Sequence, residues 1–245
     1  MSNGPVLILG ARSDIAQATA HEYAEHGYPI QLAARNSETL QIIKHDFETR
    51  YQIQVTLHDF DVLDVERHAE FVDGLPELPE IVVCAVGALG NQEEDEKDIL
   101  GAAQIIRSNF EGPASILAVL ANRFEKRASG SLVGISSVAG ERGRATNYIY
   151  GSAKAGFSAY LSGLRNRLSK KGVHVVTVLP GFVDTKMTES LDLPEKLTAQ
   201  PSEVASAIVR ATKKRKNIVY SKPVWAFIMT VIRSIPEFLF KKMRI

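Results

Sequence analysis

Short apolar runs rich in β-branched residues alternate along the chain with longer segments whose apolar residues recur at helical spacing. An apolar run without alternating polar residues is typical of a parallel strand that is buried on both faces. The expected strands are Val6–Leu9, Ile30–Ala34, Gln54–Leu57, Ile81–Val86, Ser131–Ile135, Val173–Leu179 and Ile218–Tyr220. The expected helices are Ile15–His26, Ser37–Tyr51, Val65–Val72, Ala114–Arg127, Tyr148–Lys170 and Ser202–Lys213.

Strands and helices in regular alternation predict an α/β fold. We expect a single Rossmann-like, doubly wound parallel sheet with helices on both faces, spanning residues 1–222. Residues 223–245 differ from it in composition and are expected to form an amphipathic C-terminal tail. Because the sequence shows no internal repeat and no low-complexity linker, we expect one domain.

The composition narrows the classes of partner. Lys and Arg total 29 against 28 for Asp and Glu, so the chain has no strong positive electrostatic field that would favour nucleic acid as a partner. The single cysteine, Cys84, excludes an internal disulfide and a cysteine-based metal cluster, and we predict no metal site. The first residues lead into a strand without a basic flank or a cleavable apolar segment, so we expect no signal peptide and a cytoplasmic location.

The first expected strand ends at a turn where a Rossmann-type unit brings the pyrophosphate of a dinucleotide onto a helix N-terminus. Gly10 opens this turn, and Ser13, Asp14 and Ile15 close it. Asp14 and Ala16 occupy positions where further glycines would ease close approach of the cofactor. The turn fits dinucleotide binding, and it fits equally an ordinary strand-to-helix connection with Ser13 or Asp14 as N-cap.

Two arginines help to choose the cofactor. The second expected strand closes without a carboxylate that would accept bonds from a ribose 2′-hydroxyl, whereas Arg35 and Arg12 suit a 2′-phosphate. We therefore favour NADP(H) over NAD(H), the alternative being that both arginines are solvated loop residues. After the third strand, Asp61 and Val62 are placed to meet the adenine, although Asp61, or more readily Asp64, also fits a helix N-cap.

A candidate proton donor lies near the start of the helix expected from Tyr148. Tyr150 and Lys154 stand one turn apart on the same helical face, so the phenol and the ammonium point into the same space. A nearby cation lowers the pKa of a tyrosine, which would let Tyr150 exchange a proton with a carbonyl or an alcohol. Taken alone, the pair also fits a helix whose Tyr packs and whose Lys is solvated.

These motifs together resemble the short-chain dehydrogenase/reductase family. The matching positions are Gly10, Asp14-Ile15-Ala16, Asp61-Val62, Asn109, Ser137, Tyr150, Lys154 and Pro180-Gly181-x-Val183-x-Thr185. The resemblance implies that Tyr150 donates or accepts the proton, and that Lys154 lowers its pKa and holds the nicotinamide ribose. It also implies that Ser137 bonds the substrate oxygen and that Asn109 supports a proton-relay water.

The resemblance extends to the loops around the cofactor. Residues after Pro180 and Gly181, including Val183, would form a lid over the substrate, with Thr185 near the carboxamide of the nicotinamide. Where many relatives carry Asn-Asn-Ala-Gly, the chain has Cys84-Ala85-Val86-Gly87, so Gly87 alone lets the backbone pass close to the cofactor. We assign Tyr148 to the wall of the substrate pocket.

The tail is almost wholly apolar from Val224 to Ile232. Arg233 interrupts it and Pro236 breaks it, so it falls short of the about 20 apolar residues that a spanning helix needs. Its aromatic and basic residues suit a segment that lies in a membrane interface. Packing of the tail on the core or on a partner subunit is an equal alternative.

The second half of the chain resembles more narrowly the reductases of polyprenyl-phosphoryl 2-keto-pentofuranoses (the decaprenylphosphoryl-erythro-pentofuranosid-2-ulose reductase type). This resemblance rests on Ala139–Arg144, Tyr148–Gly156 and the tail. It implies a lipid-linked keto-sugar substrate, with Arg142 and Arg144 as candidates for its phosphate. A solvated basic loop is the alternative for the two arginines.

The favoured function is therefore an NADP(H)-dependent oxidoreductase that reduces a ketone to a secondary alcohol with Tyr150 as proton donor. The lipid-linked keto-sugar would place it peripherally at the inner face of a membrane. A reductase of soluble ketones or oxoacyl thioesters is the first alternative, and a non-catalytic NADP-sensing or scaffold protein is the second. The family resemblance favours a homodimer or homotetramer.

Overall fold

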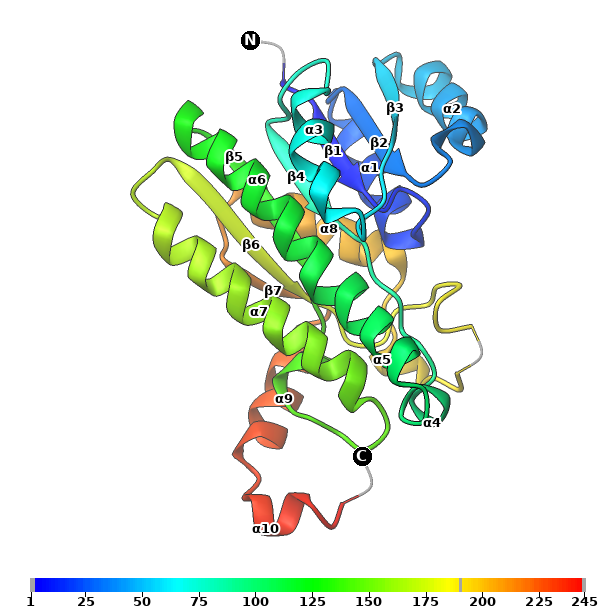
Figure 1. Cartoon of the computed structure of the whole chain (residues 1–245), viewed down its shortest axis with the longest axis vertical. Helices are drawn as coiled ribbons and strands as arrows, with labels where there is room; N and C mark the ends of the chain where they lie inside the picture. The colour runs from blue at the N-terminus through cyan, green and yellow to red at the C-terminus, as the bar shows by residue number, and fades with distance from the viewer. Residues whose placement is uncertain (1–2, 190, 244–245) are drawn as a thin grey trace.

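A seven-stranded sheet forms the centre of the molecule, with strand order β3-β2-β1-β4-β5-β6-β7 and every pairing parallel (Figure 1). The computed structural model describes residues 3–189 and 191–243. The strands are β1 (Val6–Leu9), β2 (Ile30–Ala34), β3 (Val55–Asp59), β4 (Ile81–Cys84), β5 (Gly130–Ile135), β6 (Val173–Leu179) and β7 (Ile218–Tyr220). The order reverses between β1 and β4, and ligands bind at such a switch point, beyond the carboxyl ends of the strands.

Helices cover both faces of the sheet, as the apolar strands require (Figure 1). One core cluster joins the sheet to α1 (Asp14–Glu25), α2 (Gln41–Tyr51) and α8 (Pro201–Lys213). The other joins it to α3 (His68–Asp73), α6 (Gly112–Arg127) and α7 (Tyr148–Leu168). The predicted doubly wound α/β fold is confirmed.

The differences from the predicted elements lie at their ends and in one missed region. β4 ends at Cys84, so the chain leaves the sheet where the cofactor loop was expected. Two helices were not predicted, α4 (Gln92–Asp95) and α5 (Ile99–Ile106). In α5 nearly every side chain is apolar, so the sequence shows no polar face that would mark an amphipathic helix.

The described part of the tail contains two helices, α9 (Val224–Ser234) and α10 (Glu237–Phe240), which lie below the sheet in Figure 1, beyond the carboxyl ends of its strands. Trp225 and Met229 on α9 pack against Val138 and Leu179, and all four are buried. Of the placements considered for the tail, packing on the core therefore holds for the inner face of α9. No helix in the described part of the chain is long and apolar enough to cross a membrane.

Candidate active site

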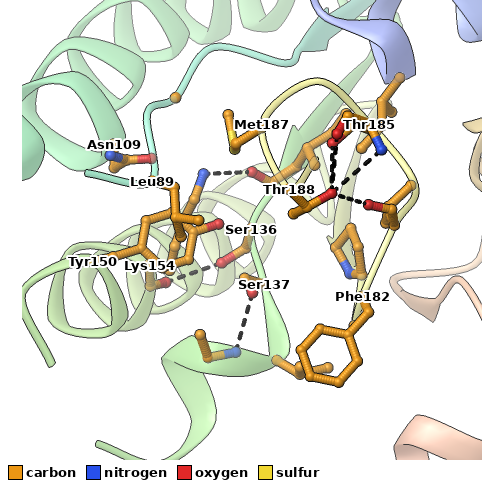
Figure 2. Close-up of a pocket in the computed structure, with 18 of the residues that line it drawn as sticks. Leu89, Asn109, Ser136, Ser137, Tyr150, Lys154, Phe182, Thr185, Met187 and Thr188 are labelled. Atoms are coloured by element: carbon orange, nitrogen blue, oxygen red, sulfur yellow. Dashed lines mark hydrogen bonds between the residues drawn. The ribbon is translucent and has the colours of Figure 1, made fainter. Parts of the chain in front are cut away.

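Tyr150 and Lys154 lie in the first turns of α7 and line one hollow at the carboxyl end of the sheet, called here the inner pocket (Figure 2). The Lys154 side chain is buried, with Nζ 5.6 Å from the centroid of the Tyr150 ring. Nζ donates a hydrogen bond of 3.1 Å to the carbonyl oxygen of Ile135. The helical spacing thus brings phenol and ammonium into the same space, as predicted.

Ser137 follows β5 and lines the same pocket. Its Oγ accepts a hydrogen bond of 3.1 Å from the backbone N–H of Ala139, at the start of a 3-10 turn. The neighbouring Ser136 differs, because its buried hydroxyl bonds the carbonyl oxygen of Lys154 at 3.0 Å and the Ser158 hydroxyl at 2.7 Å. Ser136 therefore braces β5 against α7.

Asn109 lies in a π-helical segment, Arg107–Glu111, which joins α5 to α6. Such widened turns recur at functional sites because they redirect a side chain. The Asn109 amide nitrogen donates to the carbonyl oxygens of Ala88 (2.7 Å) and Ile105 (2.9 Å). Its buried Oδ1 has no hydrogen-bond partner among the described residues, so an acceptor is left facing the site.

Gly87 separates this acceptor from the lysine. A Cβ placed on Gly87 would lie 2.6 Å from Asn109 Oδ1 and 3.3 Å from Lys154 Nζ. The missing side chain therefore leaves both polar groups accessible from one point. This arrangement fits a water that accepts from the ammonium and donates to the amide oxygen.

Burial sets the pKa values of the pair, and here one expectation needs correction. Tyr150 keeps some exposed surface, yet desolvation of its phenol raises its pKa to about 12, while the Ser137 hydroxyl acts in the lowering direction. Desolvation lowers the pKa of Lys154 to about 8. The expected lowering of the tyrosine pKa by Lys154 is absent, because burial disfavours the phenolate and the Ser137 hydroxyl is the group that opposes this effect.

A second hollow, called here the outer crevice, adjoins the inner pocket and shares several lining residues with it, including Gly87 and Thr185. Gly10 adopts φ +84°, and a Cβ there would lie 3.0 Å from the carbonyl oxygen of Ala85. This turn requires glycine on both grounds. The expected cofactor residues on this crevice are Gly10, Arg12, Ser13, Asp14, Ile15, Arg35, Asp61, Val62, Gly87 and Thr185.

The N-terminus of α1 has no side-chain cap. Ser13 occupies the N-cap position without a side-chain hydrogen bond. Asp14 is the first helical residue, and its Oδ2 accepts a hydrogen bond of 2.8 Å from the backbone N–H of Lys186. Ser13 is therefore the N-cap by position, as one alternative had it, but its side chain does not bond the helix, and the first N–H groups of α1 are left for a ligand.

Arg12 and Arg35 both line the outer crevice near the end of β2. Arg12 donates to the Asn36 carbonyl oxygen at 3.1 Å and to the Thr39 hydroxyl at 2.6 Å, so its guanidinium is oriented. Arg35 is exposed. Asp61 accepts from the backbone N–H of Leu63 at 2.9 Å and so caps its own turn, while it also borders the crevice.

The expected lid lies across the inner pocket from Tyr150 and Lys154 (Figure 2). Pro180, Gly181, Val183 and Thr185 all line the pocket. The Thr188 hydroxyl donates to the carbonyl oxygen of Val183 at 2.6 Å and lies 3.1 Å from that of Thr185, and these contacts fix the fold of the segment.

The three expected substrate residues have different surroundings. Arg144 lines the inner pocket. Arg142 does not line it and instead forms an ion pair of 2.6 Å with Glu237 on α10. Tyr148 is 45% exposed, and its hydroxyl donates to Glu96 at 3.3 Å, so its assignment to the pocket wall is wrong.

Trp225 and Asn147, which the sequence did not assign to the site, complete the pocket. Trp225 from the tail and Phe182 from the lid meet edge to face, with ring centroids 5.2 Å apart, and both line the pocket. In the sequence, Trp225 was one of the aromatic residues of the tail, with no expected place in the pocket. Asn147, just before α7, also lines the pocket and carries a buried Oδ1 without a partner among the described residues. Its polar side chain at a helix start was the only signal available.

Comparison with known proteins places the fold and the site in context. Residues 5–196 match the family model of the short chain dehydrogenases. The chain is 36% identical over 244 residues to an uncharacterized oxidoreductase of Mycobacterium tuberculosis, covering 98% of this chain and 96% of that protein.

Two solved structures share the fold. A short-chain dehydrogenase from Sphingobium yanoikuyae in complex with NADPH superposes with a TM-score of 0.84 at 23% identity, covering 98% of this chain and 96% of that one. A bulky-bulky ketone specific alcohol dehydrogenase from Comamonas testosteroni superposes with a TM-score of 0.82 at 20% identity, covering 100% and 96% of the two chains.

Proposed function

Because the chain belongs to the short-chain dehydrogenase/reductase family and is an oxidoreductase of that type, we propose that it reduces a ketone to a secondary alcohol with NADP(H). The observation that carries the proposal is the convergence of Asn109, Ser137, Tyr150 and Lys154 on one pocket. A bound nicotinamide supplies the hydride. The protein's own part is to orient the ketone and to move one proton.

Tyr150 is the proton donor in this proposal. With its pKa at about 12, the phenol is protonated at neutral pH, which is the form that a donor needs. The ketone oxygen bonds the Ser137 and Tyr150 hydroxyls, and the phenol proton is transferred as negative charge develops on that oxygen. The reverse reaction would need the phenolate, which is the minor form of Tyr150 at neutral pH.

Lys154 and Asn109 resupply the proton. The gap at Gly87, between Asn109 Oδ1 and Lys154 Nζ, fits a water that both groups hold. With a pKa of about 8, the buried ammonium gives up its proton more readily than an exposed lysine. Lys154 also contacts the ribose of the bound nicotinamide in this proposal.

The outer crevice suits NADP(H). The uncapped N-terminus of α1 offers backbone N–H groups to a pyrophosphate. Arg12 and Arg35 border the crevice near the end of β2, where a 2′-phosphate would be neutralised. The Sphingobium yanoikuyae neighbour is in complex with NADPH, which supports the same choice.

The substrate is proposed to be a bulky ketone, and a lipid-linked keto-sugar is the favoured form. Apolar side chains on the wall of the inner pocket, among them Leu89, Phe182 and Trp225, support a large apolar group. The name of the Comamonas testosteroni neighbour supports a second candidate, a water-soluble bulky ketone.

The outward face of the tail supports peripheral contact with a membrane. Phe227 on α9 and Phe238 on α10 are 72% and 63% exposed. Lys241 and Lys242 follow them in the chain. Apolar side chains beside cations suit an interface rich in anionic lipid, which is where a lipid-linked substrate would be met.

A second copy of the chain is the proposed partner. Ile99 and Leu100 at the start of α5 are 84% and 80% exposed, although α5 leads directly to Asn109. Adjacent apolar side chains at this level of exposure favour a contact between subunits, as in a homodimer or homotetramer.

The test of the proposed function compares Tyr150→Phe with the wild type. The oxidation of NADPH by a panel of bulky ketones is followed at 340 nm. We expect the variant to keep its fold and its NADPH affinity, and to lose about 10²–10⁴-fold in turnover. Turnover close to that of wild type would reject Tyr150 as the donor. Failure of NADPH oxidation with every ketone, despite tight NADPH binding, would favour the non-catalytic NADP-binding alternative.

A further inference from the structure

Two arginines lie two positions apart in the loop between the Ser137 turn and α7, and the structure gives them separate roles. Arg142 is held by the tail, because it pairs with Glu237 and its guanidinium lies 4.2 Å from the centroid of the Phe240 ring. Arg144 points to the inner pocket and lines it together with Ser137 and Tyr150.

Arg144 lacks the partners that a half-buried guanidinium normally has. No carboxylate of the described residues lies within ion-pair distance of it, and its buried Nε has no hydrogen-bond partner. Within the described ranges, its one side-chain hydrogen bond runs from Nη2 to the Met229 sulfur, a weak acceptor, at 3.6 Å. Burial lowers the pKa of Arg144, although the group stays charged at any physiological pH.

Glu141 is the acidic residue whose charge acts on Arg144 through space; other groups bind its Oε1, and its Oε2 is buried without a hydrogen-bond partner among the described residues. Its Oε1 accepts from the Tyr220 hydroxyl at 2.9 Å and from Arg233 at 3.0 Å. Glu141 attracts Arg144 without forming an ion pair with it. The guanidinium is therefore a positive group at the pocket wall that has no ion-pair partner in the described part of the chain.

We propose that Arg144 binds an oxyanion carried by the ketone substrate, either a phosphate ester or a carboxylate. A guanidinium fork matches the oxygens of both groups, and its bonds to them are strong where water is excluded. Ser137 and Tyr150 take the ketone oxygen, so Arg144 fixes the other end of the substrate. The unpaired Oδ1 of Asn147, on the same wall, accepts from a hydroxyl of that substrate.

This inference rests on the proposed function in taking the inner pocket as the substrate site, but its test requires no turnover. The protein is titrated by calorimetry, in the presence of NADP⁺, with two matched pairs of probes. One pair is farnesyl phosphate and farnesol. The other is 4-phenylbutanoate and 4-phenylbutan-1-ol. The first pair tests for binding of a lipid phosphate, and the second tests for binding of a small carboxylate.

We expect the wild type to bind at least one anion about 10- to 100-fold more tightly than its matched alcohol, as charge-assisted hydrogen bonds to a guanidinium predict. Arg144→Gln should remove this preference and leave the affinity for the alcohols unchanged. Arg144→Lys should restore part of it, because the charge remains and the fork is lost. Arg142→Gln is the matched control and should keep the full preference.

Equal affinity of the wild type for anion and alcohol in both pairs would overturn the proposal, and this comparison needs no variant to fold. If Arg144→Gln lost affinity equally for all four probes, the proposal would also be overturned, because Arg144 would then only support the pocket wall. If Arg142→Gln also lost the preference for the anions over the alcohols, the anion would bind near the contact between Arg142 and the tail, and the proposal for Arg144 would be overturned. The ketone reduction assay is separate, so the proposed function and this inference can fail independently.

Discussion

Replacement of Trp225 by alanine tests whether the tail is a structural part of the active site. The indole is buried, with 4% of its surface exposed, and its Nε1 donates a hydrogen bond of 3.0 Å to the carbonyl oxygen of Leu197. It lies directly on Gly181, where an added Cβ would be 2.0 Å from the indole Cε2. Trp225→Ala therefore removes the contact between α9, the lid and the Pro180-Gly181 turn.

The size of the effect follows from the burial. A tryptophan buries roughly 150–250 Å², which at ~25 cal/mol per Å² gives roughly 4–6 kcal/mol as an upper estimate. Partial collapse of the site recovers some of this, while the Leu197 carbonyl loses its donor at a cost of about 1 kcal/mol. We expect the free energy of unfolding to fall by about 3–5 kcal/mol, the usual range for Trp→Ala in a core.

The assay is urea unfolding followed by circular dichroism at 222 nm. The chain has a single tryptophan, so the fluorescence of the wild type reports on this contact alone and should change in the same transition. The control is Phe227→Ala on the same helix, which is 72% exposed and should change the free energy of unfolding by less than about 0.5 kcal/mol.

A loss below about 1 kcal/mol in Trp225→Ala would refute this reasoning, since surface substitutions rarely cost more. Such a result would mean that α9 is not docked on Val138 and Leu179 in solution. A tryptophan fluorescence transition at lower urea than the circular dichroism transition would mean that the tail detaches before the domain unfolds.

Four further predictions concern the cofactor, Lys154, the membrane and the oligomer. Arg35→Ala should weaken the binding of NADPH by about 10-fold or more and leave the binding of NADH unchanged, both measured by fluorescence titration. Equal losses of affinity for the two cofactors would contradict a 2′-phosphate site. The pKa of Lys154 is about 8 in the folded protein against 10.5 in the unfolded chain. The unfolded chain therefore binds more protons between these values, and stability rises with pH there. Relative to Lys154→Met, the wild type should gain roughly 1–3 kcal/mol from pH 7 to 10 in urea unfolding, and a constant difference would contradict the shift. The fraction of protein that floats with anionic vesicles should be lower for the double variant Phe227→Ser, Phe238→Ser than for the wild type. Equal fractions would contradict the proposed membrane contact. Leu100→Lys should reduce the mass measured by light scattering to that of a monomer, whereas an unchanged oligomer would place the interface elsewhere.

Much of the fold was predictable because its strands are buried on both faces. Val6–Leu9, Ile30–Ala34 and Val173–Leu179 match the predicted strands at both ends, since a buried parallel strand needs an unbroken apolar run. α5 was missed because Ile99 and Leu100 are exposed, contrary to the rule that apolar residues lie inside.

The sequence by itself determined the proximity of Tyr150 and Lys154, because four residues of α-helix fix that geometry locally. It also fixed the position of Gly10, which only a residue without Cβ can occupy. Tertiary structure decided the protonation of the pair, since burial, which depends on the whole fold, raises the pKa of Tyr150 and lowers that of Lys154.

Tertiary structure also decided which arginine reaches the pocket. Arg142 and Arg144 have the same chemistry in the same loop, and no local pattern separates them. Glu237, 95 positions from Arg142, holds that residue at the tail, whereas Arg144 borders the pocket. Trp225 likewise lines the pocket through contacts with residues far from it in the chain. A contact between segments far apart in the chain depends on how the helices pack on the sheet, and the sequence pattern of neither segment encodes it.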